Sequence, residues 1–179
     1  MKVVIATPLY PPDIAEPAPY VKALATRLSK SHEVTIVAYG RLPEPVPGVT
    51  IVAVAKDRPL IERLFSYTHA LRRAAKDADV VIAENGASVE LPAVLMALTT
   101  RTPFVLHIGD TAAHAVAEQN LGRYLIEQIA RAHARAVIED RPLARPEVIP
   151  FLPAPVAEET LYEESWQRHL SVLNQYLHA

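Results

Sequence analysis

The sequence predicts an α/β domain in which helices cover both faces of a mostly parallel sheet. Three observations lead to this prediction. Short apolar runs alternate with amphipathic helical segments along the chain. The runs are nearly continuous in apolar residues, as strands buried on both faces are. Several runs also end beside proline, glycine, asparagine or aspartate, which break strands and form turns.

The first half of the chain supplies four strands and two helices. Strands are expected at 3–6, 33–38, 49–55 and 80–83, and helices at about 19–30 and 60–75. The second helix places five side chains on one face, namely Ile61, Leu64, Phe65, Thr68 and Leu71. Helical spacing of this kind predicts a face that packs on the sheet.

The second half continues the alternation. Helices are expected at 89–98, 112–134 and 158–178, and strands at 104–108, 136–138 and 148–149. Pro92 is expected in the first turn of its helix, where proline is tolerated. The long helix has Leu121, Leu125 and Ile129 as one stripe. The chain is thus expected to form one Rossmann-like domain of about six to seven strands over 1–156. The helix in 157–179 is expected to pack back on it through Trp166, Leu170 and Leu173.

Composition excludes several classes of protein. The chain has 179 residues, a net charge of −2 and no cysteine. A length of this order fits one domain with a core of its own. The charge gives no reason to expect a nucleic-acid partner, and no apolar run is long enough to predict a transmembrane segment. The lack of cysteine excludes disulfides and fits a reducing, cytoplasmic compartment.

Function in such a sheet is expected beyond the carboxyl ends of the strands. Three loops there carry polar residues: the loop that follows the first strand, the loop with Asn85 and Gly86, and the loop with Gly109 and Asp110. No G-x-G-x-x-G follows the first strand, so a dinucleotide cofactor is not expected. His107 and His114 are seven residues apart, which is not the spacing of a helical ligand pair, so no metal is expected either.

His107 and Asp110 each have two interpretations. His107 ends a buried strand, so it is either a histidine bonded to a neighbouring loop or a group that touches a substrate hydroxyl. Asp110 precedes a helix, so it is a general base, the helix N-cap, or both.

The order of these motifs resembles that of the family-4-like glycosyltransferases with the GT-B fold. The resemblance covers about 1–156 and rests on seven segments in order: Val3 to Pro8, Pro11 to Ile14, Pro17 to Leu28, His32 to Val37, Asn85 with Gly86, Gly109 with Asp110, and Val148 to Pro150. The last helix, with Ser165 and Trp166, is similar to the family's terminal helix. The resemblance implies an acceptor-binding domain whose donor-binding partner domain is missing from the middle of the chain.

Two departures weaken the chemistry that the resemblance implies. The family has two glycines where this chain has Ala15 and Glu16, and side chains there hinder a close approach by a diphosphate. Related chains often continue Gly-Asp with x-x-Trp-Glu, where this chain has Thr111, Ala112, Ala113 and His114.

The expected function is therefore the acceptor-side half of a glycosyltransferase that is not catalytic alone. His107 and Asp110 are its expected catalytic residues. Its expected acceptor contacts are Asp13, Ile14, Ala15, Glu16, Asn85, Gly86 and Gly109. The acceptor would be a sugar or glycolipid. Two alternatives stay open: one subunit of a split transferase, completed by a donor-binding chain, and an unrelated small-molecule binder or hydrolase on a flavodoxin-like sheet. The partner considered besides a donor-binding chain is a second copy, in a homodimer.

Overall fold

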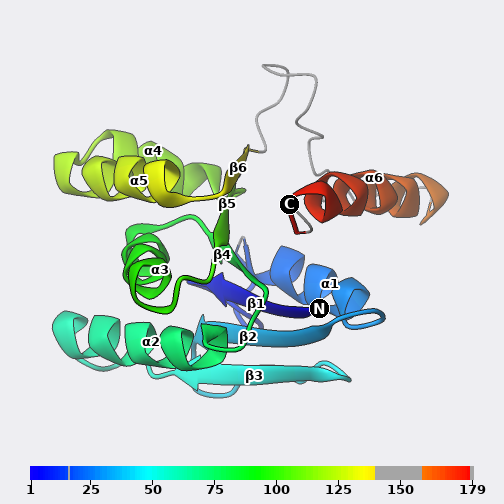
Figure 1. The fold of residues 1–179 in the computed structure, drawn as a ribbon, viewed down its shortest axis with the longest axis horizontal. Coiled ribbons are helices and arrows are strands. Elements are labelled where there is room, and N and C mark those ends of the chain that lie inside the picture. Colours follow the sequence, from blue (N-terminus) through cyan, green and yellow to red (C-terminus); the bar gives the residue numbers. More distant parts are fainter. Residues whose placement is uncertain (16, 140–158, 178–179) are drawn as a thin grey trace.

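A computed structural model describes residues 1–15, 17–139 and 159–177. Within these residues the chain alternates strands and helices, as expected (Figure 1). The strands are β1 (Lys2–Thr7), β2 (Glu33–Tyr39), β3 (Val49–Val54), β4 (Val80–Glu84), β5 (Phe104–Ile108) and β6 (Ala136–Glu139). The helices are α1 (Ala18–Leu28), α2 (Leu60–Ala75), α3 (Ala87–Thr100), α4 (Thr111–Glu118), α5 (Leu121–His133) and α6 (Glu159–Leu177).

The six strands form one parallel sheet in the order β3-β2-β1-β4-β5-β6. The sheet therefore starts in the middle with β1, grows to one edge through β2 and β3, and then grows to the other edge from β4. The side on which successive strands are added therefore reverses between β1 and β4, while all strands keep the same direction. The expected Rossmann-like α/β fold is confirmed, and the expected strand at 148–149 lies outside the described residues.

Each face of the sheet is covered by its own helices. Alternate side chains of β1, such as Val3 and Ile5, pack beneath α1 and α6. The intervening side chains, such as Val4 and Ala6, pack beneath α2, α3 and α5. Figure 1 shows the two groups of helices on opposite sides of the sheet. This alternation explains why the strands are apolar on both faces.

The terminal helix packs back on the domain, as expected. Trp166, Leu173 and Leu177 of α6 are fully buried with Tyr20 and Leu24 of α1, and Leu170 is half-buried beside them. The Trp166 ring stacks on Tyr20 at a centroid distance of 5.7 Å, and the Arg27 guanidinium lies 4.3 Å from the Trp166 ring. The expected boundary between 1–156 and 157–179 lies outside the described residues.

The expected long helix over 112–134 is wrong, because the chain forms two helices there. Asn120 caps the second of them: its side-chain oxygen accepts a hydrogen bond from the Arg123 amide at 3.1 Å. The capping bond satisfies an amide that has no helical partner, which favours a new helix start over continuation.

One expected apolar face points outward, and another is divided between the outside and the core. In α5, Leu121, Leu125 and Ile129 are 75%, 50% and 47% exposed, while the small Ala130 faces the sheet. In α2, Ile61 and Phe65 are 68% and 73% exposed, and the residues that face the sheet are Tyr67, Leu71 and Ala75.

Pro92 is not in the first turn, since α3 begins at Ala87 and holds Pro92 in its interior. A proline there cannot donate a hydrogen bond to the carbonyl of Ser88. The hydroxyl of Tyr39 donates to that carbonyl instead, at 3.0 Å. A side chain from β2 thus stabilises the interrupted helix.

No helix in the described part of the chain is long and apolar enough to cross a lipid bilayer.

Candidate functional site

A cavity of about 440 Å³ opens at the carboxyl end of the sheet, where the strand order reverses. The loop after β1 turns toward α1 on one face, and the loop after β4 turns toward α3 on the other. The two loops separate and leave a crevice, which is where parallel α/β sheets bind ligands. Pro8 and Leu9 form one side of the cavity, and Asn85, Gly86 and Ser88 form another.

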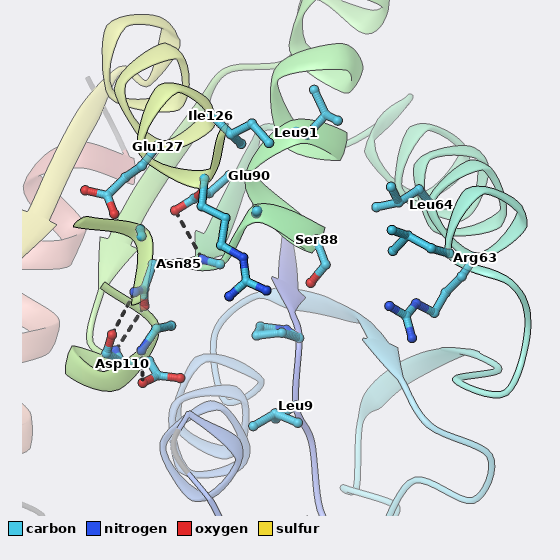
Figure 2. A pocket seen from close by; sticks show the side chains of 17 residues that line it. Leu9, Arg63, Leu64, Asn85, Ser88, Glu90, Leu91, Asp110, Ile126 and Glu127 are labelled. Atoms are coloured by element: carbon cyan, nitrogen blue, oxygen red, sulfur yellow. Dashed lines mark hydrogen bonds between the residues drawn. The ribbon is translucent and has the colours of Figure 1, made fainter. Parts of the chain in front are cut away.

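The cavity has apolar walls and polar groups that converge on its floor, as small-molecule sites do. Figure 2 shows Arg63 and Leu64 of α2 facing Glu90, Leu91 and Ile126 across it, with Asn85 and Asp110 below. Arg123 and Glu127 of α5 complete the polar lining. A volume in this range holds a monosaccharide or a ligand somewhat larger.

Asn85 and Asp110 are joined by two hydrogen bonds. The Asp110 amide donates to Asn85 Oδ1 at 3.0 Å, and Asn85 Nδ2 donates to the Asp110 carbonyl at 2.8 Å. Asn85 is buried, and its own amide donates to the carbonyl of His107. Asn85 thereby ties the end of β4 to the loop after β5.

Asp110 is the N-cap of α4. Its Oδ1 accepts a hydrogen bond from the Ala113 amide at 2.9 Å, and the same residue lines the cavity. Of the two interpretations of Asp110, the N-cap is present in the structure. The residue also borders the cavity, so a role as a general base stays open.

His107 does not line this cavity. Its ring lies on the opposite face of the sheet, 2% exposed, with Nδ1 2.8 Å from the Glu84 carboxylate. It stacks on Tyr20 at 4.7 Å between centroids and lies edge-on to His169 of α6. Its position links β4, β5 and the terminal helix within the interior.

Gly109 passes very close to the His107 ring. A Cβ at this position would meet His107 Cε1 at 2.7 Å, a distance that side chains do not adopt. Gly109 therefore serves the path of the chain between His107 and Asp110.

The residues expected from the first loop lie apart from this cavity. The Asp13 carboxylate pairs with Lys56 at 2.6 Å, and Ile14 is 92% exposed. Both line a second hollow of about 480 Å³ beside α1, with Lys22 and Glu44. Ala15 is exposed, and Glu16 lies outside the described residues. The expected acceptor contacts thus fall into two groups, of which Asn85 and Gly86 share the cavity with Asp110.

Glu90 is a cavity residue that the sequence analysis did not identify. It is 2% exposed, and its Oε1 accepts a hydrogen bond from the Gly86 amide at 3.1 Å. Burial raises the pKa of Glu90 to about 7, helped by the nearby Glu127 and opposed by the bond from Gly86. One signal was available, since Glu90 is the single charged residue of α3. A carboxyl that titrates near neutral pH in a cavity is able to accept or donate a proton.

Behind Glu90 lies a chain of paired charges. Glu127, also 2% exposed, accepts from Arg131 Nε at 3.0 Å and lies 2.9 Å from His114 Nδ1. Arg131 also contacts Glu139 of β6. This arrangement compensates the buried charge of Glu127 and holds the wall of the cavity in place.

The two arginines of the cavity come from α2 and α5, the helices that flank α3. Arg63 Nη1 donates to the Lys56 carbonyl at 3.3 Å, and its guanidinium lies 5.6 Å from the Tyr39 ring. Arg123 lies in the first turn of α5 and is exposed. With Asp110 and Glu90 they provide both donors and acceptors, which suits a ligand that carries many hydroxyl groups. The described residues hold no group of three metal-ligating side chains.

Sequence comparisons identify no relative. No protein-family model matches the chain, and no curated protein matches it.

Solved structures do resemble it. HepE of Anabaena, in complex with UDP and glucose, superposes with a TM-score of 0.56 and 14% identity over 77% of this chain and 37% of its own. A UDP-N-acetylglucosamine 2-epimerase superposes with a TM-score of 0.54 and 14% identity, covering 90% of this chain and 53% of its own. The enzyme of the same name from Methanocaldococcus jannaschii gives a TM-score of 0.51 and 11% identity, with 78% and 39% covered.

The chain spans between 37% and 53% of the length of these three proteins. Identities this low relate folds and carry no residue roles with them. The chain has the GT-B-like, Rossmann-type fold of part of these nucleotide-sugar enzymes.

Proposed function

We propose that the chain is the acceptor-side half of a nucleotide-sugar glycosyltransferase, and that it is not catalytic alone. The main support for the proposal is the cavity at the carboxyl end of the sheet between β1 and β4, where the strand order reverses. The cavity has apolar walls and a polar floor. A sugar acceptor lies there, and a donor-binding domain or chain closes over the carboxyl edge of the sheet.

Two further observations support the proposal. The similar structures include a protein that holds UDP and glucose, and this chain spans 37% of its length. The resemblance to family-4-like transferases implies that the rest of such a protein holds the nucleotide sugar. In this proposal 1–156 is the acceptor domain, 157–179 is the returning terminal helix, and the donor domain between them is missing.

Transfer to a hydroxyl requires a group that positions it and takes its proton. Asp110 is the proposed base, because it lines the cavity at the start of α4. Glu90 is a second proton acceptor close by, with a pKa of about 7. His107 lies on the opposite face of the sheet and does not line the cavity, so it acts as a positioning residue that supports the Gly109 turn.

A split transferase, in which a second chain brings the donor, is favoured by one observation. Leu60, on the rim of the cavity, is 59% exposed, and Ile14, beside the second hollow, is 92% exposed. Apolar side chains at the edge of a ligand site are suited to contact with a partner. We place the protein in the cytoplasm, in keeping with the cysteine-free sequence.

The proposal is tested by NMR titration of the ¹⁵N-labelled chain with monosaccharides such as glucose and N-acetylglucosamine. Shifts are expected at the amides of Gly86, Ser88 and Asp110. Arg123→Gln should weaken the binding roughly 10-fold, since it removes charged hydrogen bonds to hydroxyls. Arg72→Gln, an exposed change elsewhere on α2, is the matched control. The proposal would be contradicted by chemical-shift changes confined to other surfaces, or by an Arg123→Gln variant that binds the sugar as tightly as the parent.

A further inference from the structure

The outer face of α3 is apolar and open. α3 has one charged residue, Glu90, and that residue is buried. Leu95 and Leu98, which point away from the sheet, are 42% and 63% exposed. A helix that is apolar on every side is normally covered on every side. In the single chain, the sheet, α2 and α5 cover the inner sides of α3, and nothing among the described residues covers the outer one.

The two helices that flank α3 also have exposed apolar side chains. α3 packs between α2 and α5, as Figure 1 shows. Leu64, Leu91 and Ile126 come one from each helix and line the same cavity. Beyond them lie exposed side chains of the two flanking helices: Ile61, Phe65, Leu121, Leu125 and Ile129. We call these five, with Leu95 and Leu98, the α3 face.

The size of the α3 face is that of one side of a stable interface. Its side chains are between 42% and 75% exposed. If a whole large side chain offers roughly 150–200 Å², the exposed apolar area is on the order of 700 Å². The largest apolar patch of an ordinary monomer is about 300–600 Å². One partner in a standard protein–protein interface contributes about 800 Å².

Charge decides which occupant fits. In a two-fold dimer each residue near the axis meets its own copy, so a charged residue there meets a like charge. The exposed residues of α3 are Leu95, Leu98 and Thr99, all uncharged, so α3 can lie against a second α3 without repulsion. A partner selected by complementary charge would find no charge at the centre of this face to pair with.

We infer that the α3 face is the interface of a homodimer, in which α3 packs against α3 of a second copy. The inference does not depend on the proposed glycosyltransferase function.

The oligomeric state of the full chain tests the inference. Sedimentation and light scattering should give twice the chain mass of 19.7 kDa at micromolar concentration. Leu95→Glu and Leu98→Glu should each weaken dimerisation on the order of 100-fold or more, because each places two carboxylates in the interface. Leu42→Glu is the matched control: Leu42 is 84% exposed in the loop between β2 and β3, and the dimer should persist.

Disulfide trapping gives a second test that does not require a destabilising charge. The chain has no cysteine, so Leu98→Cys and Leu95→Cys each introduce the only thiol. At least one should form a covalent dimer on mild oxidation, much faster than Leu42→Cys. A monomer at all concentrations, or a dimer that is unchanged by Leu95→Glu and Leu98→Glu and not trapped by either cysteine, would overturn the inference. If the chain is monomeric at all concentrations, the α3 face is the binding surface for a partner of another kind.

Discussion

The hydroxyl of Tyr39 donates a hydrogen bond to the carbonyl of Ser88 at 3.0 Å, and this carbonyl is the one that Pro92 leaves without a helical donor. Tyr39 also stacks on Tyr67 at 4.3 Å between ring centroids. Burial raises the pKa of Tyr39 to about 12, so the hydroxyl keeps its proton and its donor role. One residue of β2 therefore completes a helix that begins at the wall of the cavity.

Tyr39→Phe should reduce the free energy of unfolding by about 1–2 kcal/mol, because it leaves the Ser88 carbonyl without a donor. In a Pro92→Ala background the substituted residue has a backbone amide that can donate to Ser88, so the same change should cost less than half as much. Urea denaturation of the four proteins measures this coupling. Equal costs in both backgrounds would show that Tyr39 does not replace the missing donor.

The pair of hydrogen bonds between Asn85 and Asp110 should be a major source of stability at the cavity. Asn85→Ala leaves the Asp110 amide without its acceptor and removes one of the two hydrogen bonds that the Asp110 carbonyl accepts, the other coming from the His114 amide, so about 1–3 kcal/mol should be lost. Chemical denaturation measures the loss. Asn174→Ala, at an exposed position on α6, should change the free energy of unfolding by less than about 0.5 kcal/mol. Similar values for the two variants would refute this role for Asn85.

Gly109→Ala should destabilise the chain by about 1–3 kcal/mol, because the added methyl meets the His107 ring at 2.7 Å. The ring cannot easily withdraw, since Glu84 and Tyr20 hold it. Gly122→Ala in the first turn of α5 is the control. Its methyl would find ordinary space, and alanine favours helix, so this change should be neutral or stabilising by up to about 1 kcal/mol. Thermal melts of both variants give the comparison, and a harmless Gly109→Ala would contradict the geometry.

Glu90 should make the stability fall as pH rises. Its pKa is about 7 in the folded chain against an ordinary value of 4.5. Between these values the folded state binds more protons than the unfolded state, so the stabilising effect is complete below pH 4.5 and is lost as pH rises through 7. The shift corresponds to at most about 3 kcal/mol.

Glu90→Gln removes this titration. The variant should therefore gain stability relative to the parent as the pH is raised from about 4.5 to about 8, by an amount approaching that limit. Denaturation at a series of pH values measures the difference. Glu62→Gln, at an exposed position on α2, is the control and should show no such trend. A constant difference between parent and Glu90→Gln would mean that Glu90 does not titrate in this range.

The sheet could be predicted from the sequence because each strand is a short, nearly continuous apolar run. The run at 80–83, for example, became β4, which lies in the middle of the sheet. Placing the loops after β1, β4 and β5 at one edge follows from the parallel direction alone. The grouping of Asn85, Gly86 and Asp110 could be predicted for the same reason.

Helix orientation could not be predicted in the same way. Periodicity shows that α5 has an apolar side with Leu125 and Ile129, but it does not show whether that side meets the sheet or the solvent. The side that packs inward has Ala130, which is small, and Glu127, which is charged and paired with Arg131. Neither residue type indicates a buried face in the sequence. The break before α5 depends on one capping side chain, Asn120, in a segment rich in helix formers.

Contacts between residues that are far apart in the sequence could not be predicted either. His107 follows an apolar run, which correctly placed it at a strand end. Its pairing with Glu84 and its contact with His169 depend on strand order and on the docking of α6. Those contacts turn a residue expected at the acceptor into one that supports the interior.

The most direct test of the proposed half-enzyme is calorimetric titration of this chain alone with UDP-sugars. If the donor site belongs to another domain or chain, the isolated protein should bind them no more tightly than about 1 mM, which corresponds to about 4 kcal/mol. Binding in the low micromolar range would contradict the account, because the chain would then hold a donor site of its own.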